Sequence, residues 1–116
     1  MAIPDYQTIM LPLLRLAESG DEYRTQDAIE KIVTKFGLSI AEREQVLPGG
    51  TKTVISNRVQ WAKTYLAQAR LLESTRRAHF KITDRGRQVL EDAPVKIDNK
   101  FLSQFDEFKV FLTRKR

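Results

Sequence analysis

Apolar residues recur along this chain at the three- and four-residue spacing typical of amphipathic helices. The first such stretch covers residues 4–20, and Pro12 inside it predicts a kink or a late helix start. The second predicts a helix with Thr25 as its N-cap and Gly37 just beyond its end. A third, short helix is predicted after Ser39, where a glutamate three residues on completes a capping box.

The longest periodic segment follows, in residues 51–72. Its apolar residues fall within about 40° of one line on a helical projection and form the predicted buried stripe. This stripe comprises Ile55, Val59, Ala62, Leu66 and Ala69. The opposite arc is polar, and no acidic residue occurs between positions 45 and 72. Since an ordinary surface helix mixes Glu with Lys for i,i+4 pairing, this absence favours a functional face over a merely solvated one.

Two short alternating segments, LLES and HFKIT, come next, joined by TRRA. They predict a β-hairpin whose inward residues are Leu72, Phe80 and Ile82. Thr83 then begins another helix, DRGRQVLE, which returns to the core. Two strands alone are marginal in water, so the hairpin must pack on the helices. The order of elements predicts a mainly α fold with a small β-hairpin, specifically a winged helix-turn-helix, in residues 1–91.

Residues 92–116 are predicted to be a linker and an amphipathic helix, because apolar residues from Phe101 to Leu112 keep helical spacing. Three roles are open for this helix: it fits a fragment whose neighbour is missing, it packs back on the domain, or it pairs with a second copy. The segment contains DEFK, the end of the acid-x-lysine signature of many nucleases. That signature needs a strand to hold both side chains on one metal, so we interpret the match as chance.

Composition excludes several classes of protein. The 116 residues fit one domain and contain no cysteine, and His79 is the single histidine. Thiolate metal sites are therefore excluded, and we expect neither a catalytic residue nor a metal ligand. No apolar run approaches the roughly 18 residues that span a bilayer, and the N-terminus does not resemble a signal peptide. We expect a cytoplasmic protein without a membrane partner.

The net charge of +5 is distributed unevenly. Residues 1–50 hold five Lys or Arg against eight Asp or Glu, a balance of −3, whereas residues 51–90 hold nine against two, a balance of +7. The last 26 residues hold six against five. A concentrated positive field suits a polyanion such as nucleic acid or an anionic lipid surface; the alternative is a solvated basic face without a partner.

In a helix-turn-helix the second helix of the pair enters the major groove, which assigns base reading to residues 52–64. Asn and Gln can pair with adenine there, and Ser and Thr are less selective. Arginines in the hairpin turn can reach a phosphate pair or the minor groove. The candidate DNA-binding residues are Lys52, Thr53, Ser56, Asn57, Gln60, Lys63, Arg76, Arg77 and Lys81, and Arg85 would widen the same basic strip.

Three further residues of the long helix have alternative interpretations. Arg58 lies nearer the buried side, so an internal salt bridge suits it as well as a DNA contact. Trp61 and Tyr65 could stack on bases, but half-buried packing on a neighbouring helix is the better interpretation. If the basic strip neutralises about five phosphates, log affinity should fall with log salt at a slope of about −4.5.

The segments VLPGG, NRVQWAKTYLAQARLLE and the basic stretch that ends in ITDRG together resemble the N-terminal domain of the Mrr restriction endonuclease family, over residues 4–91. Residues 94–111 resemble the linker that follows it. The resemblance implies a winged-helix domain that delivers a nuclease to DNA, typically DNA with modified bases. It also implies that a separate, magnesium-dependent C-terminal domain cuts the DNA. The chain ends at Arg116, so we expect a fragment, or a protein that works with a partner.

The leading hypothesis is therefore a double-stranded DNA-binding, target-recognition domain of an Mrr-type, modification-dependent restriction endonuclease. We expect this chain to bind without cutting and to need no cofactor of its own. One alternative is a stand-alone transcriptional regulator that forms a homodimer through Phe101–Leu112 and binds a palindromic site. The other is a winged-helix protein-interaction module whose basic face meets an acidic protein.

Overall fold

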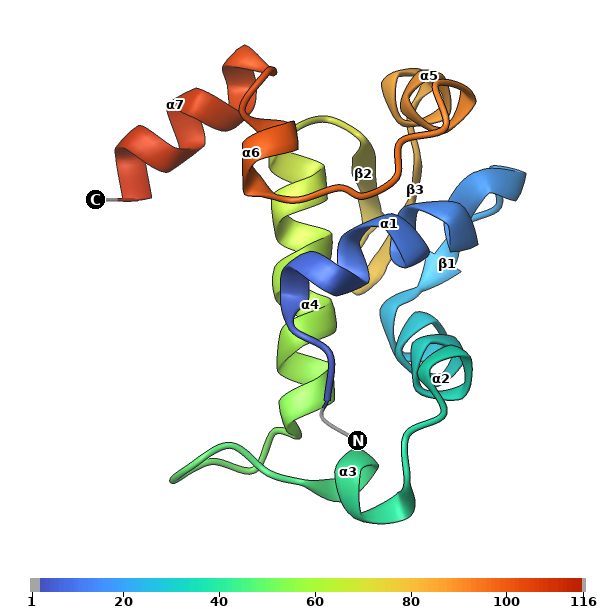
Figure 1. Ribbon diagram of the computed structural model, residues 1–116, viewed down its shortest axis with the longest axis vertical. Coiled ribbons are helices and arrows are strands. Elements are labelled where there is room, and N and C mark those ends of the chain that lie inside the picture. The colour runs from blue at the N-terminus through green and yellow to red at the C-terminus, as the bar shows by residue number, and fades with distance from the viewer. Residues whose placement is uncertain (1–2, 116) are drawn as a thin grey trace.

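The computed structural model describes residues 3–115, without the side chain of Lys115. Figure 1 shows the longest helix, α4, running through the molecule with the other elements around it. The mainly helical fold with a small antiparallel sheet confirms the predicted mainly α class with a β-hairpin, while the winged helix-turn-helix stays a prediction. The elements are α1 (Tyr6–Leu16), η1 (Ala17–Ser19), β1 (Tyr23–Arg24), α2 (Thr25–Phe36), α3 (Ile40–Glu44), α4 (Val54–Gln68), β2 (Leu72–Arg76), β3 (His79–Ile82), α5 (Asp84–Glu91), α6 (Asn99–Leu102) and α7 (Asp106–Lys115).

The predicted helix ends are confirmed at some positions and wrong at others. Gly37 ends α2 with a φ of 62°, and Ser39 and Glu42 form the capping box of α3. Thr25 is not an N-cap: it is the first residue of α2, and its side chain is buried. The helix around Pro12 has no late start, because the Asp5 carboxylate caps α1 by accepting from the Thr8 amide (2.7 Å).

The sheet has three strands in the order β1-β3-β2, all antiparallel. Leu72 lies opposite Ile82, and these two side chains and that of Phe80 are buried, as predicted. Strand β1 was not predicted, because two residues are too short to show any alternation. Its Tyr23 pairs with Phe80 and stacks on the Phe80 ring with centroids 6.1 Å apart.

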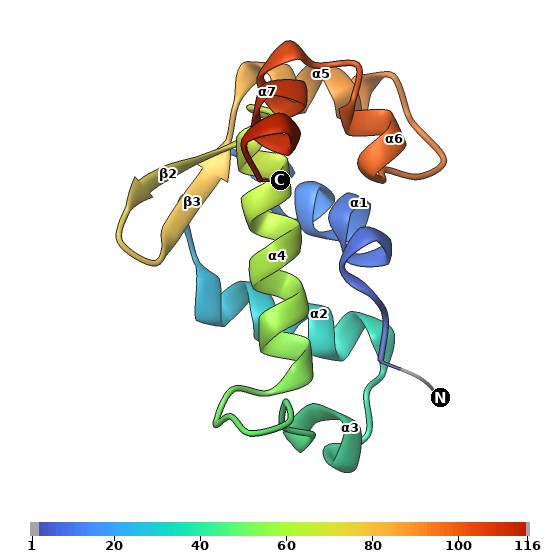
Figure 2. The same ribbon diagram turned by 90° about the vertical axis from the view of Figure 1, so that its left-hand side faces the viewer.

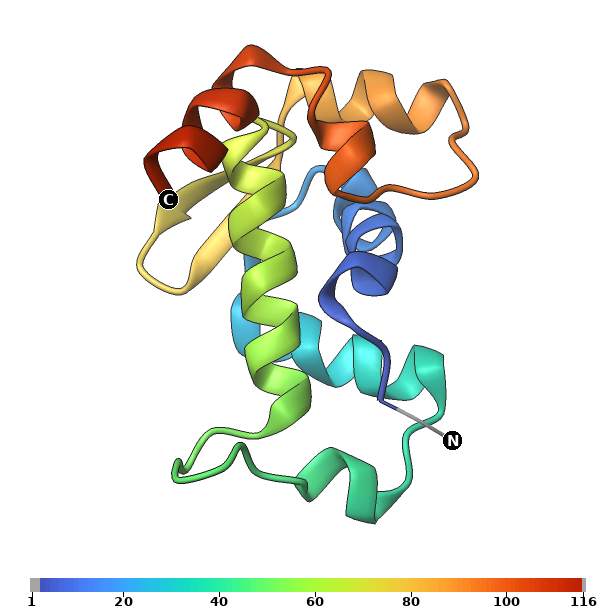
Figure 3. The ribbon, with the colours of Figure 1, turned by 60° about the vertical axis from the view of Figure 1, so that its left-hand side comes forward.

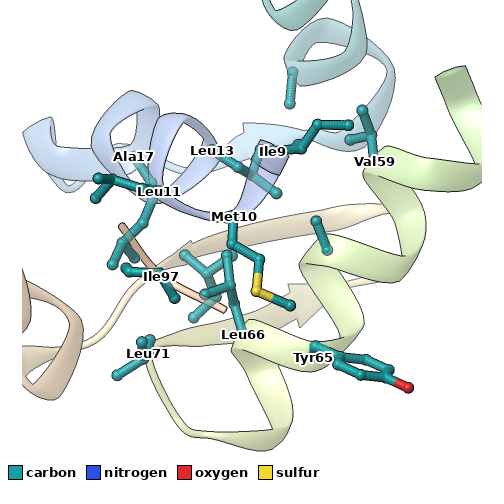
Figure 4. Close-up of a cluster of buried hydrophobic side chains, with 14 of the residues drawn as sticks. Ile9, Met10, Leu11, Leu13, Ala17, Val59, Tyr65, Leu66, Leu71 and Ile97 are labelled. Atoms are coloured by element: carbon teal, nitrogen blue, oxygen red, sulfur yellow. The ribbon is translucent and has the colours of Figure 1, made fainter. Parts of the chain in front are cut away.

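The core lies between α1 and α4 and extends under the sheet. Figure 4 shows Met10 of α1 and Leu66 of α4 pointing toward one another, with Leu71 nearby. All three side chains are fully buried. The whole predicted stripe of α4, from Ile55 to Ala69, is buried as well. This packing leaves the polar arc of α4 on the outside. No helix within residues 3–115 is long and apolar enough to cross a membrane.

The C-terminal segment is two helices instead of the single predicted one. The break falls at Ser103 and Gln104, whose side chains donate to the carbonyls of Asn99 (2.8 Å) and Phe101 (3.0 Å). Such bonds compete with helix continuation, which hydrophobic spacing does not reveal. Helix α7 packs back against α4, beside its C-terminal half, and buries Phe108 completely (Figure 3). Pairing with a second copy stays a prediction.

The cap of α1 predicts a dependence of stability on pH. Hydrogen bonds from the Thr8 backbone, the largest cause, lower the pKa of Asp5 below its usual 3.8. Because folding lowers the pKa of Asp5, its ionised carboxylate stabilises the fold at pH values above the ordinary pKa. This stabilisation is lost as the pH falls through the pKa of the folded state. Asparagine caps equally well but does not titrate. At neutral pH we expect Asp5→Asn to be slightly less stable than wild type, because it lacks the negative charge that favours a helix N-terminus. The difference in free energy of unfolding between the two proteins should narrow below about pH 4.

Urea unfolding at a series of pH values tests this prediction by giving the free energy of unfolding of both proteins. A constant gap between the two proteins across the acid range would contradict it.

Candidate nucleic-acid interface

The polar face of α4 is accessible along most of the helix. Ser56, Asn57, Gln60 and Thr64 are each partly exposed there. The helix begins later than predicted, at Val54, so two of the candidate residues precede it. Thr53 is the N-cap, and its hydroxyl accepts from the amide of Ser56 (3.2 Å). Lys52 lies in the exposed loop before it, next to the helix N-terminus.

Lys63 connects this helix to the hairpin through Thr25. The Lys63 amine donates to the Thr25 hydroxyl (3.3 Å), and the Thr25 amide donates to the carbonyl of Ala78 in the hairpin turn (2.8 Å). Burial lowers the pKa of Lys63 below its usual value. Two hydrogen bonds therefore join the middle of α4 to the turn between β2 and β3. Sequence reasoning missed this link, because Thr25 was assigned to capping.

The two arginines predicted in the hairpin turn differ in their surroundings. Arg76 is the last residue of β2 and not a turn residue, and it forms an exposed ion pair with Glu22, with Nη2 3.1 Å from Oε1. Arg77 is exposed, and no carboxylate within residues 3–115 lies within 4 Å of it. Figure 2 shows the hairpin projecting beside α4, with this turn at its outer end.

Lys81 and Arg85 lie nearer the base of the hairpin than its turn. Lys81 lies 3.6 Å from Glu73 on the neighbouring strand. Arg85 donates to the Ala69 carbonyl (3.0 Å) and to Glu107 (2.9 Å), and its guanidinium lies over the ring of Phe105. These bonds tie Arg85 to the end of α4 and to α7, and its place in the basic strip stays a prediction.

Three other residues of α4 have structural partners. Arg58 donates to the carbonyls of Ile3 (2.8 Å) and Pro4 (3.2 Å), which are internal bonds but not the predicted salt bridge. Tyr65 is buried and makes an edge-on contact with Trp61, whose side chain is 42% exposed. The packing interpretation of this aromatic pair is therefore confirmed for Tyr65, while Trp61 keeps a large exposed area.

The DEFK stretch lies on a helix, as the hydrophobic spacing predicted. Glu107 bonds to Arg85, and that hydrogen bond is the main cause of the lowered pKa of Glu107. Lys109 lies 3.9 Å from Asp106, one turn away on the same helix. In the described part of the chain, no three His, Asp or Glu side chains gather where they could hold a metal ion.

A family model described as the Mrr N-terminal domain matches residues 6–92. The chain belongs to the Mrr N-terminal domain family. This confirms the resemblance inferred from the sequence and associates the chain with a restriction endonuclease family, of which this is the N-terminal domain. The matched residues run from the start of α1 to the end of α5, so the Mrr N-terminal domain contains every candidate interface residue, whereas α6 and α7 follow it. No curated protein and no solved structure gives a significant match.

Proposed function

We propose that this chain is the duplex DNA-binding, target-recognition domain of an Mrr-type restriction endonuclease, with α4 in the major groove and the β2–β3 hairpin as a wing. The observation that carries the proposal is the link from Lys63 through Thr25 to Ala78. It holds the hairpin turn beside a helix face that bears no acidic residue. The strand order β1-β3-β2, with a long helix directly before the hairpin, also supports a winged helix-turn-helix.

The residues divide into two groups by their chemistry. On α4, the side chains of Asn57 and Gln60 offer the donor and acceptor pair that matches adenine, and Ser56 can bond to any base edge. Lys52 lies at the helix N-terminus, where amides and a lysine together favour a phosphate. Arg77 supplies the planar fork that suits a phosphate or a narrow minor groove. Base contacts would set the sequence preference and phosphate contacts the affinity.

The ion pairs of Arg76 and Lys81 are compatible with phosphate contacts. Both pairs are exposed, with side chains between 36% and 67% accessible. Exposed pairs contribute only about 0–1 kcal/mol. A DNA phosphate can therefore displace Glu22 or Glu73 at little cost, and both cations stay in the proposed interface.

We also propose that the domain reads modified bases, and this part of the proposal rests on the family alone. We propose further that binding needs no cofactor, because the amide, hydroxyl and cationic groups named above supply every contact. Magnesium, which the family resemblance assigns to a separate nuclease domain, is then expected to act on binding only as a competing cation.

Fluorescence anisotropy with matched methylated and unmethylated duplexes, at two salt concentrations, tests the proposal. We expect binding that weakens steeply with salt. The double variant Lys52→Ala, Arg77→Ala should weaken binding to all sequences alike and flatten the log–log salt slope by about 1.8. Asn57→Ala should change which duplex is preferred, at a cost of about 1–3 kcal/mol on the best site.

Lys100→Ala is the matched control, because this exposed lysine lies on α6, outside the interface. Absent binding, or an equal loss in the control, would contradict the DNA-binding proposal. Binding to an acidic protein but not to DNA would favour the protein-interaction alternative.

A further inference from the structure

A second cationic site lies at the base of the hairpin, where α4 ends and α5 begins. A surface hollow of about 560 Å³ is lined there by four cationic side chains: Arg70 just after α4, Lys81 of β3, and Arg85 and Arg87 of α5. We propose that this basal hollow binds a phosphate group. Only Lys81 also belongs to the interface proposed above, so the basal hollow is a separate site.

Arg70 stands where the backbone favours glycine. It follows the last turn of α4 in the left-handed region, with φ at 65°. The amide of Arg70 donates to the Ala67 carbonyl (3.0 Å), and the amide of Leu71 donates to the Leu66 carbonyl (2.9 Å). This is the Schellman motif, whose left-handed residue is usually glycine because a Cβ adds strain. The sequence nevertheless places an arginine there, with its side chain in the wall of the hollow.

Arg87 lies against Gly20, which also lines the hollow. A Cβ on Gly20 would collide with Nη2 of Arg87, so the guanidinium occupies the space that a side chain would fill. Between the two arginines, the Thr83 hydroxyl donates to the Arg70 carbonyl (2.6 Å) and accepts from the Gly86 amide (3.0 Å). The end of α4 and the start of α5 are thereby fixed relative to one another, and so is the backbone that carries both guanidinium groups.

The acidic residues nearby leave these two arginines without a carboxylate partner. Glu73 pairs with Lys81, and Glu107 pairs with Arg85. Asp84 also lines the hollow, but within residues 3–115 no carboxylate lies within 4 Å of the guanidinium of Arg70 or of Arg87. A guanidinium fork donates two parallel hydrogen bonds to a phosphate, so two arginines that line one hollow suit this ligand.

The phosphate can come from the DNA backbone or from a free phosphate compound. The DNA source rests on the function proposed above: the hairpin whose turn would lie on the duplex leads at its base to this hollow. The free source does not depend on that function. The chemistry of the site is the same in both cases.

Arg70→Gly gives an unusually clean test, because glycine is the residue that the backbone prefers at this position. The variant should therefore melt at or above the wild-type temperature. Inorganic pyrophosphate, titrated against ¹⁵N-labelled protein, should shift the amides of residues 70–71 and 83–87. We expect both Arg70→Gly and Arg87→Gln to weaken this binding at least tenfold. Lys100→Gln, which removes a charge outside the hollow, should leave it unchanged.

The duplex titration then separates the two sources. A weaker duplex affinity in Arg70→Gly, with a salt slope flatter by about 0.9, identifies the DNA backbone as the source. Loss of pyrophosphate binding with unchanged duplex affinity identifies a free phosphate compound. No localised shift in the wild type, or full pyrophosphate binding by Arg70→Gly, overturns the proposal. Failure of the proposed α4 interface would appear separately, as unchanged duplex affinity in the double variant Lys52→Ala, Arg77→Ala.

Discussion

Gly86→Ala is expected to lower the free energy of unfolding by about 3 kcal/mol, near the upper end for overpacking a buried site. Gly86 is buried in the first turn of α5. A Cβ there would collide with the Leu71 carbonyl oxygen and lie 2.7 Å from Cγ1 of Ile82. The Leu71 carbonyl cannot move freely, because it accepts from the Thr83 amide (3.1 Å). The better helix propensity of alanine, about 1 kcal/mol, offsets only part of this cost.

Gly50→Ala is the matched control for this substitution. The same methyl group there would come no closer than 3.8 Å to the nearest atom, in an exposed loop. Chemical denaturation of the two variants should show a large loss for Gly86 and little change for Gly50. Equal stability of both variants would mean that α5 does not approach the end of α4 as closely as described.

The parts of the fold that the sequence predicts well are those governed by local periodicity. The buried stripe of α4 and the inward residues of the hairpin follow from spacings of 3.6 and 2 residues. Ser39 and Thr83 act as caps because a hydroxyl bonds an amide three residues ahead. Thr25 has the same local pattern, but it is the first residue of α2 and does not cap the helix. Its hydroxyl instead bonds Lys63, which is 38 positions away, and no local pattern contains that contact.

In the candidate interface, too, some features follow from the local sequence and others depend on contacts between distant residues. The acid-free polar face of α4 is visible in the sequence, whereas the pairing of Arg76 with Glu22 joins residues 54 positions apart. Arg70 and Arg87 received no role from the sequence. The single available signal was an arginine where a helix end favours glycine, and that signal appears only once the helix boundary is known.

The separation of charge along the sequence survives folding to a large extent. Within residues 3–115, the ion pair of Arg76 with Glu22 is the one that joins the acidic first 50 residues to the basic residues 51–90. Two further ion pairs stay within the first half, that of Asp27 with Arg24 and that of Glu30 with Arg43. Within residues 3–115, ion pairs engage Arg76, Lys81 and Arg85 among the nine cations of the middle segment, so most of its positive field remains, which supports a polyanionic partner.

Phe108→Ala is expected to destabilise the fold by about 3–5 kcal/mol, the usual cost of truncating a buried phenylalanine. The Phe108 ring is fully buried and lies edge-on to Tyr65, with centroids 5.6 Å apart. Tyr65 also contacts Trp61, the one tryptophan of the chain. Loosening α7 should therefore change Trp61 fluorescence as well as the denaturation midpoint. Val110→Ala, on the same helix at a position 49% exposed, should change neither.

The Phe108→Ala variant also shows whether α7 contributes to DNA binding. Trp61 and Tyr65 lie on the flank of α4 opposite Lys63, since a separation of two residues places each of them roughly 160° away from it. The contact between α7 and α4 is thus remote from the link to the hairpin. Well below its melting temperature, Phe108→Ala should keep its duplex affinity within about twofold, as expected for independent sites. A larger loss would show that α7 positions the reading face of α4 or touches the DNA itself.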